Sequence, residues 1–150
     1  MGNEKQVPQL DQLGRLEKSL FQLSDVIQKH QEIVQRRFKV SAVEIDILTL
    51  LRTEGDKKMK DIGQRVNVKL SNLTNIIDRL EGHRFVKRVN SKKDRRSIFV
   101  NITSKGIKLL DNYATFLREL STRMRNSIQE DQFGIVVEGL EKISQVDLGS

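Results

Sequence analysis

The chain has 150 residues and a formal net charge of +7, and a domain of this length can bury a hydrophobic core without covalent cross-links. The absence of Cys excludes disulfides, zinc–thiolate sites and thiol redox chemistry, and the two His stand far apart in sequence. No apolar run approaches the ~20 residues of a membrane span, so we expect a cytoplasmic protein that binds no membrane. We also expect no bound metal and no cofactor.

The N-terminal part of the chain predicts one long helix after the only proline, Pro8. From Leu10 to Phe38 the apolar residues recur at spacings of three and four, and His30 lies on the same stripe. This is the pattern of an amphipathic helix. We therefore predict a flexible N-terminus over residues 1–8 and a helix over residues 9–38 whose apolar stripe needs a partner.

Three shorter helices are predicted next. Ser41 and Glu44 form a capping-box pattern before an apolar run that continues to about Thr53. Residues 59–66 predict a short helix, and Asn67 a turn. A further helix follows over residues 71–83. Its apolar side chains, expected to point inward, are Leu70, Leu73, Ile76, Ile77 and Leu80.

After Gly82 the apolar period changes from about 3.6 to about 2, which predicts two strands at residues 85–90 and 97–103. Thr103 and Ser104 can cap a further helix, and a last one carries the stripe from Phe133 to Ile143. The predicted fold is mainly α with a small two-stranded β wing. A winged helix-turn-helix over residues 39–103 is flanked by helices at 9–38 and 104–147. We interpret the flanking helices as a homodimerisation layer; an intramolecular bundle is the alternative.

Two short helices joined by a tight turn are typical of a helix-turn-helix that binds double-stranded DNA. The outer face of the second helix carries Ser, Thr and Asn, whose short side chains can reach base edges in the major groove. By itself such a face is usually just a helix surface exposed to solvent, and only the basic loop that follows favours DNA binding. The predicted DNA-binding residues on this helix are Lys69, Ser71, Asn72, Thr74, Asn75 and Arg79.

The positive charge is concentrated in the same segment. From Arg52 to Lys105 there are 15 Lys and Arg against 6 Asp and Glu, whereas the rest of the chain has 12 against 14. Such asymmetry favours a polyanionic partner. The loop between the strands would be a wing tip, where Arg can enter the minor groove and Lys can contact the backbone. Its predicted DNA-binding residues are Lys92, Lys93, Asp94, Arg95 and Arg96.

From about Phe38 to Gly106 the chain resembles the MarR family of transcriptional regulators, most strongly in LSNLTNIIDRLE and DRRSIFVNITSKG. The family's wing signature is matched by Asp94, Arg96, Ile102 and Thr103. The resemblance implies a homodimer on a pseudo-palindromic operator, more often a repressor than an activator. It also implies that Arg96, oriented by Asp94, enters the minor groove, that the Ser, Asn and Thr side chains face bases or phosphates, and that the remaining Lys and Arg contact the backbone.

Many members of this family respond to a small aromatic or anionic ligand. Phe21, Tyr113 and Phe116 are aromatic candidates to line such a pocket, but plain core positions are the favoured explanation, and no residue is assigned to ligand binding. Arg84 stands where the family commonly has Gly, so either Arg84 takes a positive φ or the preceding helix ends early. Gly63 replaces a usual Ala, which close packing of two helices would explain.

Three other functions fit the sequence less well. A winged-helix module that binds another protein would favour large aromatic anchors over a face of Ser, Asn and Thr. Nonspecific DNA packaging needs the cations but not that polar face. An enzyme is disfavoured, because no nucleophile–base constellation, phosphate-binding loop or closely spaced His pair can be placed.

Overall fold

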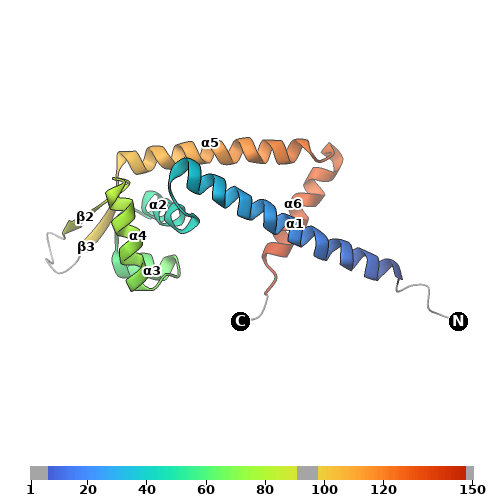
Figure 1. The fold of residues 1–150 in the computed structure, drawn as a ribbon, viewed down its shortest axis with the longest axis horizontal. Helices are drawn as coiled ribbons and strands as arrows, with labels where there is room; N and C mark the ends of the chain where they lie inside the picture. Colours follow the sequence, from blue (N-terminus) through green and yellow to red (C-terminus); the bar gives the residue numbers. More distant parts are fainter. Residues whose placement is uncertain (1–6, 91–97, 148–150) are drawn as a thin grey trace. The chain divides into compact units, whose positions relative to one another are not determined.

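The computed structural model describes residues 7–90 and 98–147, with only the backbone for residues 7–10. It contains α1 (Val7–Phe38), α2 (Ala42–Glu54), β1 (Lys57–Lys58), α3 (Met59–Arg65), α4 (Leu70–Gly82), β2 (Val86–Asn90), β3 (Ile98–Ile102), α5 (Ser104–Asn126) and α6 (Glu130–Ser144) (Figure 1). The predicted fold class, a mainly helical winged helix-turn-helix, is confirmed. Most of the predicted flexible N-terminus, residues 1–6, and the predicted wing tip lie outside the described residues.

The chain divides into two compact units, residues 1–110 and 111–150, with the division inside α5. In the first unit α1 is a single helix from Val7 to Phe38, which begins two residues before the predicted range 9–38 and so includes the last two residues of the predicted flexible N-terminus. Only its C-terminal end contributes to the core, through Val34, whereas the stripe before it is exposed. Its exposed large apolar side chains are Leu13, Leu16, Leu20, Phe21, Leu23, Val26, Ile27 and Ile33.

The core of the first unit lies among α2, α3, α4 and the sheet. The predicted capping box at the start of α2 is present: Ser41 and Glu44 each accept a hydrogen bond from the other's backbone N–H. Side chains of α2, α3 and α4 are fully buried together with Val86 and Val100 of the strands. The helical members of this core are Ile47, Leu48, Leu51, Ile62, Leu73, Ile77 and Leu80.

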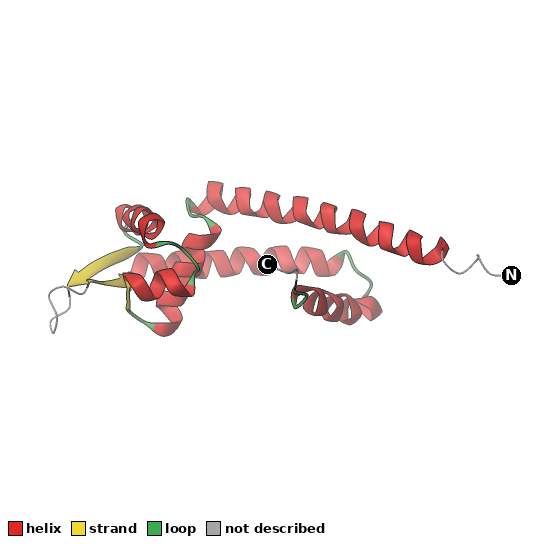
Figure 2. Cartoon of the chain, turned by 90° about the horizontal axis from the view of Figure 1, so that it is seen from below, coloured by secondary structure: helices red, strands yellow, loops and turns green. Residues whose placement is uncertain are grey.

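The sheet has three antiparallel strands in the order β1-β3-β2, so the prediction of two strands was incomplete. Val100 of β3 lies opposite Lys57 of β1 on one side and Arg88 of β2 on the other. The strand β1 was missed because two residues are too few to show an alternating pattern. Figure 2 shows β2 and β3 as a ribbon projecting from the helices.

The loop geometry resolves two questions raised by the sequence. Arg84 adopts φ 61°, so the positive-φ alternative is correct. At Gly63 an added Cβ would lie 2.9 Å from the backbone oxygen of Val68 at the turn into α4. Close approach to the Val68 backbone therefore explains this glycine, and an Ala here would require the backbone to shift.

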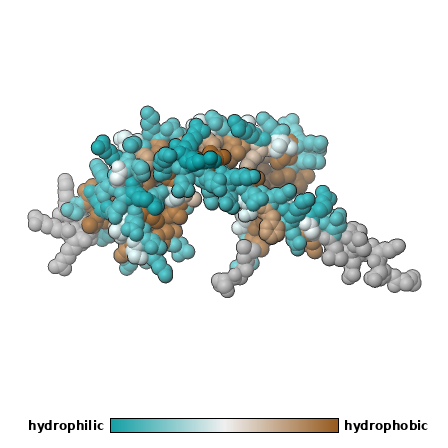
Figure 3. All heavy atoms as spheres, viewed as in Figure 1, coloured by the Kyte–Doolittle hydropathy of each residue, from teal (hydrophilic) through white to brown (hydrophobic). Residues whose placement is uncertain are grey.

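The second unit consists of α5 from Asp111 onward and the whole of α6. Its described side chains are exposed or half-buried, Tyr113 and Phe116 among the latter. The exposed large apolar residues of this unit are Met124, Ile135, Val136, Leu140, Ile143 and Val146. Hydrophobic surface is visible among the hydrophilic side chains in Figure 3. In the described part of the chain, no helix combines the length and apolar content that crossing a bilayer requires.

Candidate nucleic-acid interface

The helix α4 has one buried and one exposed face. Leu73, Ile77 and Leu80 have no exposed surface and hold the helix against the core. The residues predicted from sequence to bind DNA lie on the rest of its surface, and all are exposed: Lys69, Ser71, Asn72, Thr74, Asn75 and Arg79. The structure therefore brings the recognition-helix candidates together on one accessible surface.

The start of α4 is electrostatically suited to an anion. Lys69 is the N-cap residue, and no acidic residue occupies the first turn. The positive end of the helix dipole and the free N–H groups of that turn therefore meet no carboxylate of their own helix. Thr74 donates its hydroxyl to the backbone oxygen of Leu70 at 3.0 Å, which orients that side chain on the exposed face.

One predicted inward position of α4 was wrong. Leu70, the first residue of the helix, is 57% exposed. The apolar stripe continues past the edge of the core, because the first turn extends beyond the helices and strands that cover the later turns. Leu70 instead lines a shallow depression of about 360 Å³ together with Met59, Gly63 and Val68.

Arg79 has a protein partner that the sequence did not indicate. Its Nε donates to Oε1 of Glu44 at 3.0 Å, and the Glu44 side chain is only 6% exposed, whereas that of Arg79 is 60% exposed. The other Glu44 oxygen accepts the backbone N–H of Ser41 at 2.7 Å. Glu44 thus links the start of α2 to the outer face of α4 and restrains the Arg79 guanidinium.

A second ion-pair cluster fixes β2 to α4. Arg88 of β2 lies 2.7 Å from Oδ1 of Asp78 and 2.6 Å from Oε2 of Glu81, and its backbone N–H donates to Oε1 of Glu81 at 2.9 Å. That backbone hydrogen bond is the main reason why the pKa of Glu81 is lowered, with the Arg88 side chain adding to it. Burial disfavours the charged form of Arg88, but its bonds to Asp78 and Glu81 outweigh burial and raise its pKa.

The sequence contains a pattern from which this ion-pair cluster could have been predicted. Arg88 is in phase with Val86 and so faces α4, and Asp78 and Glu81 are three residues apart on the preceding helix. The cluster sets the base of the wing relative to the recognition helix. The wing-tip candidates themselves, Lys92, Lys93, Asp94, Arg95 and Arg96, lie outside the described residues.

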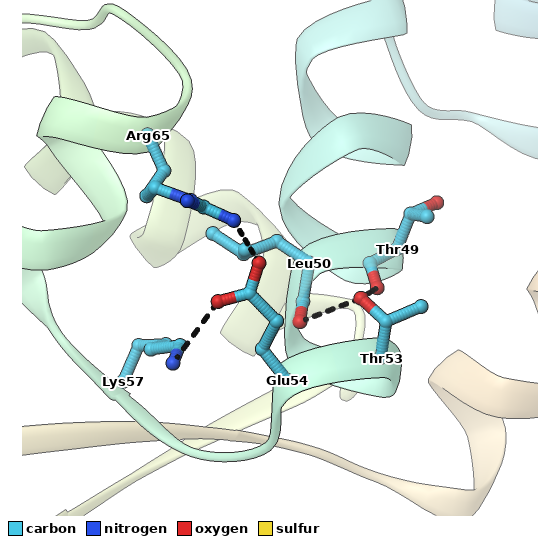
Figure 4. A network of polar contacts seen from close by, with 6 residues as sticks. All are labelled: Thr49, Leu50, Thr53, Glu54, Lys57 and Arg65. Carbon is cyan, nitrogen blue, oxygen red and sulfur yellow. Dashed lines mark hydrogen bonds and ion pairs between the residues drawn. The ribbon is translucent and has the colours of Figure 1, made fainter.

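A third network of ion pairs connects the end of α2 to β1 and to the end of α3. Glu54, at the end of α2, forms ion pairs with Lys57 of β1, at 3.2 Å, and with Arg65 at the end of α3 (Figure 4). The hydrogen bond from Lys57, with Arg65 close by, lowers the pKa of Glu54.

Nowhere in residues 7–90 and 98–147 do His, Asp and Glu gather in a group of three that could hold a metal ion.

Comparison with known proteins identifies the family. A model of the MarR family matches residues 40–98. The chain is 31% identical to the HTH-type transcriptional regulator YkoM of Bacillus subtilis over 73% of this chain and 69% of that protein. It is 30% identical to the HTH-type transcriptional regulator MhqR of the same organism over 69% of this chain and 72% of that protein.

The chain belongs to the MarR family. Another relative, YfiV of Bacillus subtilis, is 38% identical, but the chain spans only 46% of that protein's length. Among solved structures, YusO of Bacillus subtilis matches with a TM-score of 0.82 at 24% identity, covering 94% of this chain and 99% of that one. FabT of Streptococcus pneumoniae, solved in complex with DNA, matches with a TM-score of 0.73 at 21% identity, covering 89% and 95%.

Proposed function

We propose that this MarR-family chain is a homodimeric, sequence-specific DNA-binding regulator, more specifically a cytoplasmic repressor of a pseudo-palindromic operator. The observation that carries the proposal is the exposed Ser, Asn and Thr face of α4, beside an N-terminal turn without acidic residues. In a helix-turn-helix the start of the second helix meets base edges in the major groove. The relatives named as HTH-type transcriptional regulators, and the DNA-bound FabT structure, support it.

The two ends of α4 would then have different roles. The first turn and a half offers Ser71, Asn72 and Asn75 to bases or phosphates, and Lys69 to the backbone. Arg79, restrained by Glu44 but largely exposed, would contact a backbone phosphate through its terminal nitrogens. Restraint before binding lowers the entropy lost when the contact forms.

The wing proposal rests on sequence and family resemblance. Arg96, oriented by Asp94, would enter the minor groove, and Lys92, Lys93 and Arg95 would contact phosphates. The Arg88 cluster supports this proposal, because it holds the strand that leads to the wing tip against the recognition helix.

Homodimerisation is proposed from exposed apolar surface. In α1 the residues Leu13, Leu16, Leu20 and Ile27 are 45–55% exposed on one stripe, and α6 exposes Leu140 and Ile143 to a similar degree. An exposed apolar stripe along a helix, as in α1, marks an interaction site. A second copy of the chain would cover it and would place two recognition helices about one helical turn of DNA apart. A small aromatic or anionic ligand that shifts this spacing would release the operator.

The test is fluorescence anisotropy with labelled duplexes from the region upstream of the protein's own gene, against shuffled duplexes, over a salt series. If the dimer neutralises ~6–10 phosphates, affinity falls roughly 10³–10⁵-fold between about 50 and 200 mM salt. We expect Arg96→Ala to weaken binding to the preferred duplex by roughly 1–3 kcal/mol and Lys92→Ala to weaken all duplexes alike. Lys142→Ala on α6 is the lysine control, and it should leave the affinity for every duplex unchanged.

Each alternative gives a distinct result in this assay. Steep salt dependence without preference for any inverted repeat, also in duplexes selected from a random pool, would favour DNA packaging. No binding at low salt would favour a winged-helix module that docks on protein. Either result would refute the proposed function.

A further inference from the structure

The recognition helix begins with an exposed apolar side chain. Leu70 is 57% exposed, whereas Leu73, Ile77 and Leu80 on the same helix have no exposed surface. It is the only large apolar residue of α4 that is exposed. Within the lobe formed by α2–α4 and the strands, it is also more exposed than Val89 and Ile98, at 41% and 42%.

Folding does not account for Leu70 at this position. A side chain left more than half exposed contributes little burial, and the residues beside it, Lys69, Ser71 and Asn72, are polar and exposed. Leu70 lines the depression between α3 and the start of α4 together with Met59 and Val68. The result is one apolar spot, with room next to it, at the end of a helix that otherwise presents hydrogen-bonding groups.

The chemistry of the major groove offers one apolar group, the 5-methyl group of thymine. The other base edges in that groove present hydrogen-bond donors and acceptors. Residues at the start of a recognition helix are the ones that approach base edges. We propose that Leu70 contacts the 5-methyl group of one thymine in each half-site and thereby determines which base that position accepts. This inference rests on the proposed function, because it requires α4 to enter the major groove.

The test removes the methyl group and nothing else. Once a preferred duplex is known, each thymine is replaced in turn by deoxyuridine, which keeps the base pair and its hydrogen-bonding groups. For wild-type protein we expect one position in each half-site where the replacement weakens binding about 4-fold, and about 15-fold when both half-sites are replaced, as burial of one methyl group predicts. The other thymines should tolerate replacement.

The same series with Leu70→Ala gives the decisive comparison. In that variant the deoxyuridine penalty at the sensitive position should disappear, because there is no apolar partner for the methyl group. Leu70→Met should keep the penalty in part. Val89→Ala, which shortens another exposed apolar residue of the same lobe, should leave the wild-type profile unchanged. Thermal unfolding of each variant checks that the fold is intact.

The outcomes separate this inference from the proposed function. A deoxyuridine penalty that persists in Leu70→Ala overturns the role of Leu70, although sequence-specific binding stands. Equal weakening of all duplexes by Leu70→Ala, without any methyl dependence, also overturns it and assigns Leu70 to the DNA backbone. A wild-type protein with no sequence preference overturns the proposed function itself, and with it this inference.

Discussion

Gly106 is the position where a single added methyl group should do most damage to the lobe. It lies in the first turn of α5 and is buried. An added Cβ would overlap the backbone oxygen of Phe85 and lie 2.8 Å from Cγ1 of Ile102. The Phe85 oxygen accepts a hydrogen bond from the backbone N–H of Thr103 at 2.9 Å. The Thr103 hydroxyl, which donates to the backbone oxygen of Arg84 at 2.7 Å, lies 3.1 Å from the same Phe85 oxygen. The Phe85 oxygen cannot move away without loosening the hydrogen bond from the Thr103 N–H.

These contacts set the magnitude expected for Gly106→Ala. Overpacking costs about 1–3 kcal/mol, and weakening the hydrogen bond from the Thr103 N–H adds about 0.5–1.5 kcal/mol. The better helix propensity of Ala returns up to about 1 kcal/mol. We therefore expect the free energy of unfolding to fall by about 0.5–4.5 kcal/mol.

The assay is urea unfolding followed by circular dichroism at a fixed protein concentration, since the proposed dimerisation would make apparent stability depend on concentration. Gly82→Ala is the matched control. Gly82 ends α4 in the same lobe, and an added Cβ there meets no atom within 4 Å. It should be neutral or stabilising by up to about 1 kcal/mol. Equal unfolding curves for the two variants would refute the argument that Gly106 is held by close backbone contact.

Three other changes test separate parts of the structure. Arg84→Gly should raise the free energy of unfolding by up to about 1 kcal/mol, because Arg84 adopts φ 61° and glycine takes that conformation without strain. The greater freedom of glycine in the unfolded chain offsets part of this gain. A clear loss of stability in the urea assay would contradict the prediction. Glu81→Gln should reduce the loss of stability at acid pH. The lowered pKa of Glu81 means that its carboxylate stabilises the fold above its ordinary pKa of 4.5 and ceases to do so as the pH falls through the lowered value. Equal pH dependence of wild type and variant, measured by urea unfolding, would remove that role. Leu20→Glu combined with Ile27→Glu should yield monomers in analytical ultracentrifugation and weaken operator binding, since both side chains are about half exposed on the proposed dimer stripe; an unchanged dimer would place the interface elsewhere.

The parts of the fold that depend on local pattern could be predicted from the sequence. Helix α1, the Ser41–Glu44 capping box and the hairpin of β2 and β3 follow from spacing and capping chemistry, and the observed strands start and end within one residue of the predicted ones. Thr103 caps α5 as expected, with its hydroxyl accepting the N–H of Gly106 at 3.1 Å.

The features that were missed depend on tertiary geometry. Whether Leu70 is buried depends on how far the core extends along α4, which its spacing from Leu73 does not reveal. The ion pair between Arg79 and Glu44 is not indicated by the sequence, because the two residues are 35 positions apart. Nothing in the pattern around either residue indicates that α2 and α4 bring them together.

The three anchors of α4 have a common consequence for recognition. Arg79 ties the helix to α2, Asp78 and Glu81 tie it to β2, and at the turn before it Gly63 allows a close approach to Val68. The two ion-pair anchors lie in the C-terminal half of the helix, whereas the exposed Ser, Asn and Thr side chains lie in the N-terminal half. A recognition helix held in this way loses little backbone freedom on binding, and the remaining cost is the ordering of a few short side chains. Short Ser, Asn and Thr side chains are therefore well matched to this helix, since the ion pairs of Arg79 with Glu44 and of Asp78 and Glu81 with Arg88 already determine its position.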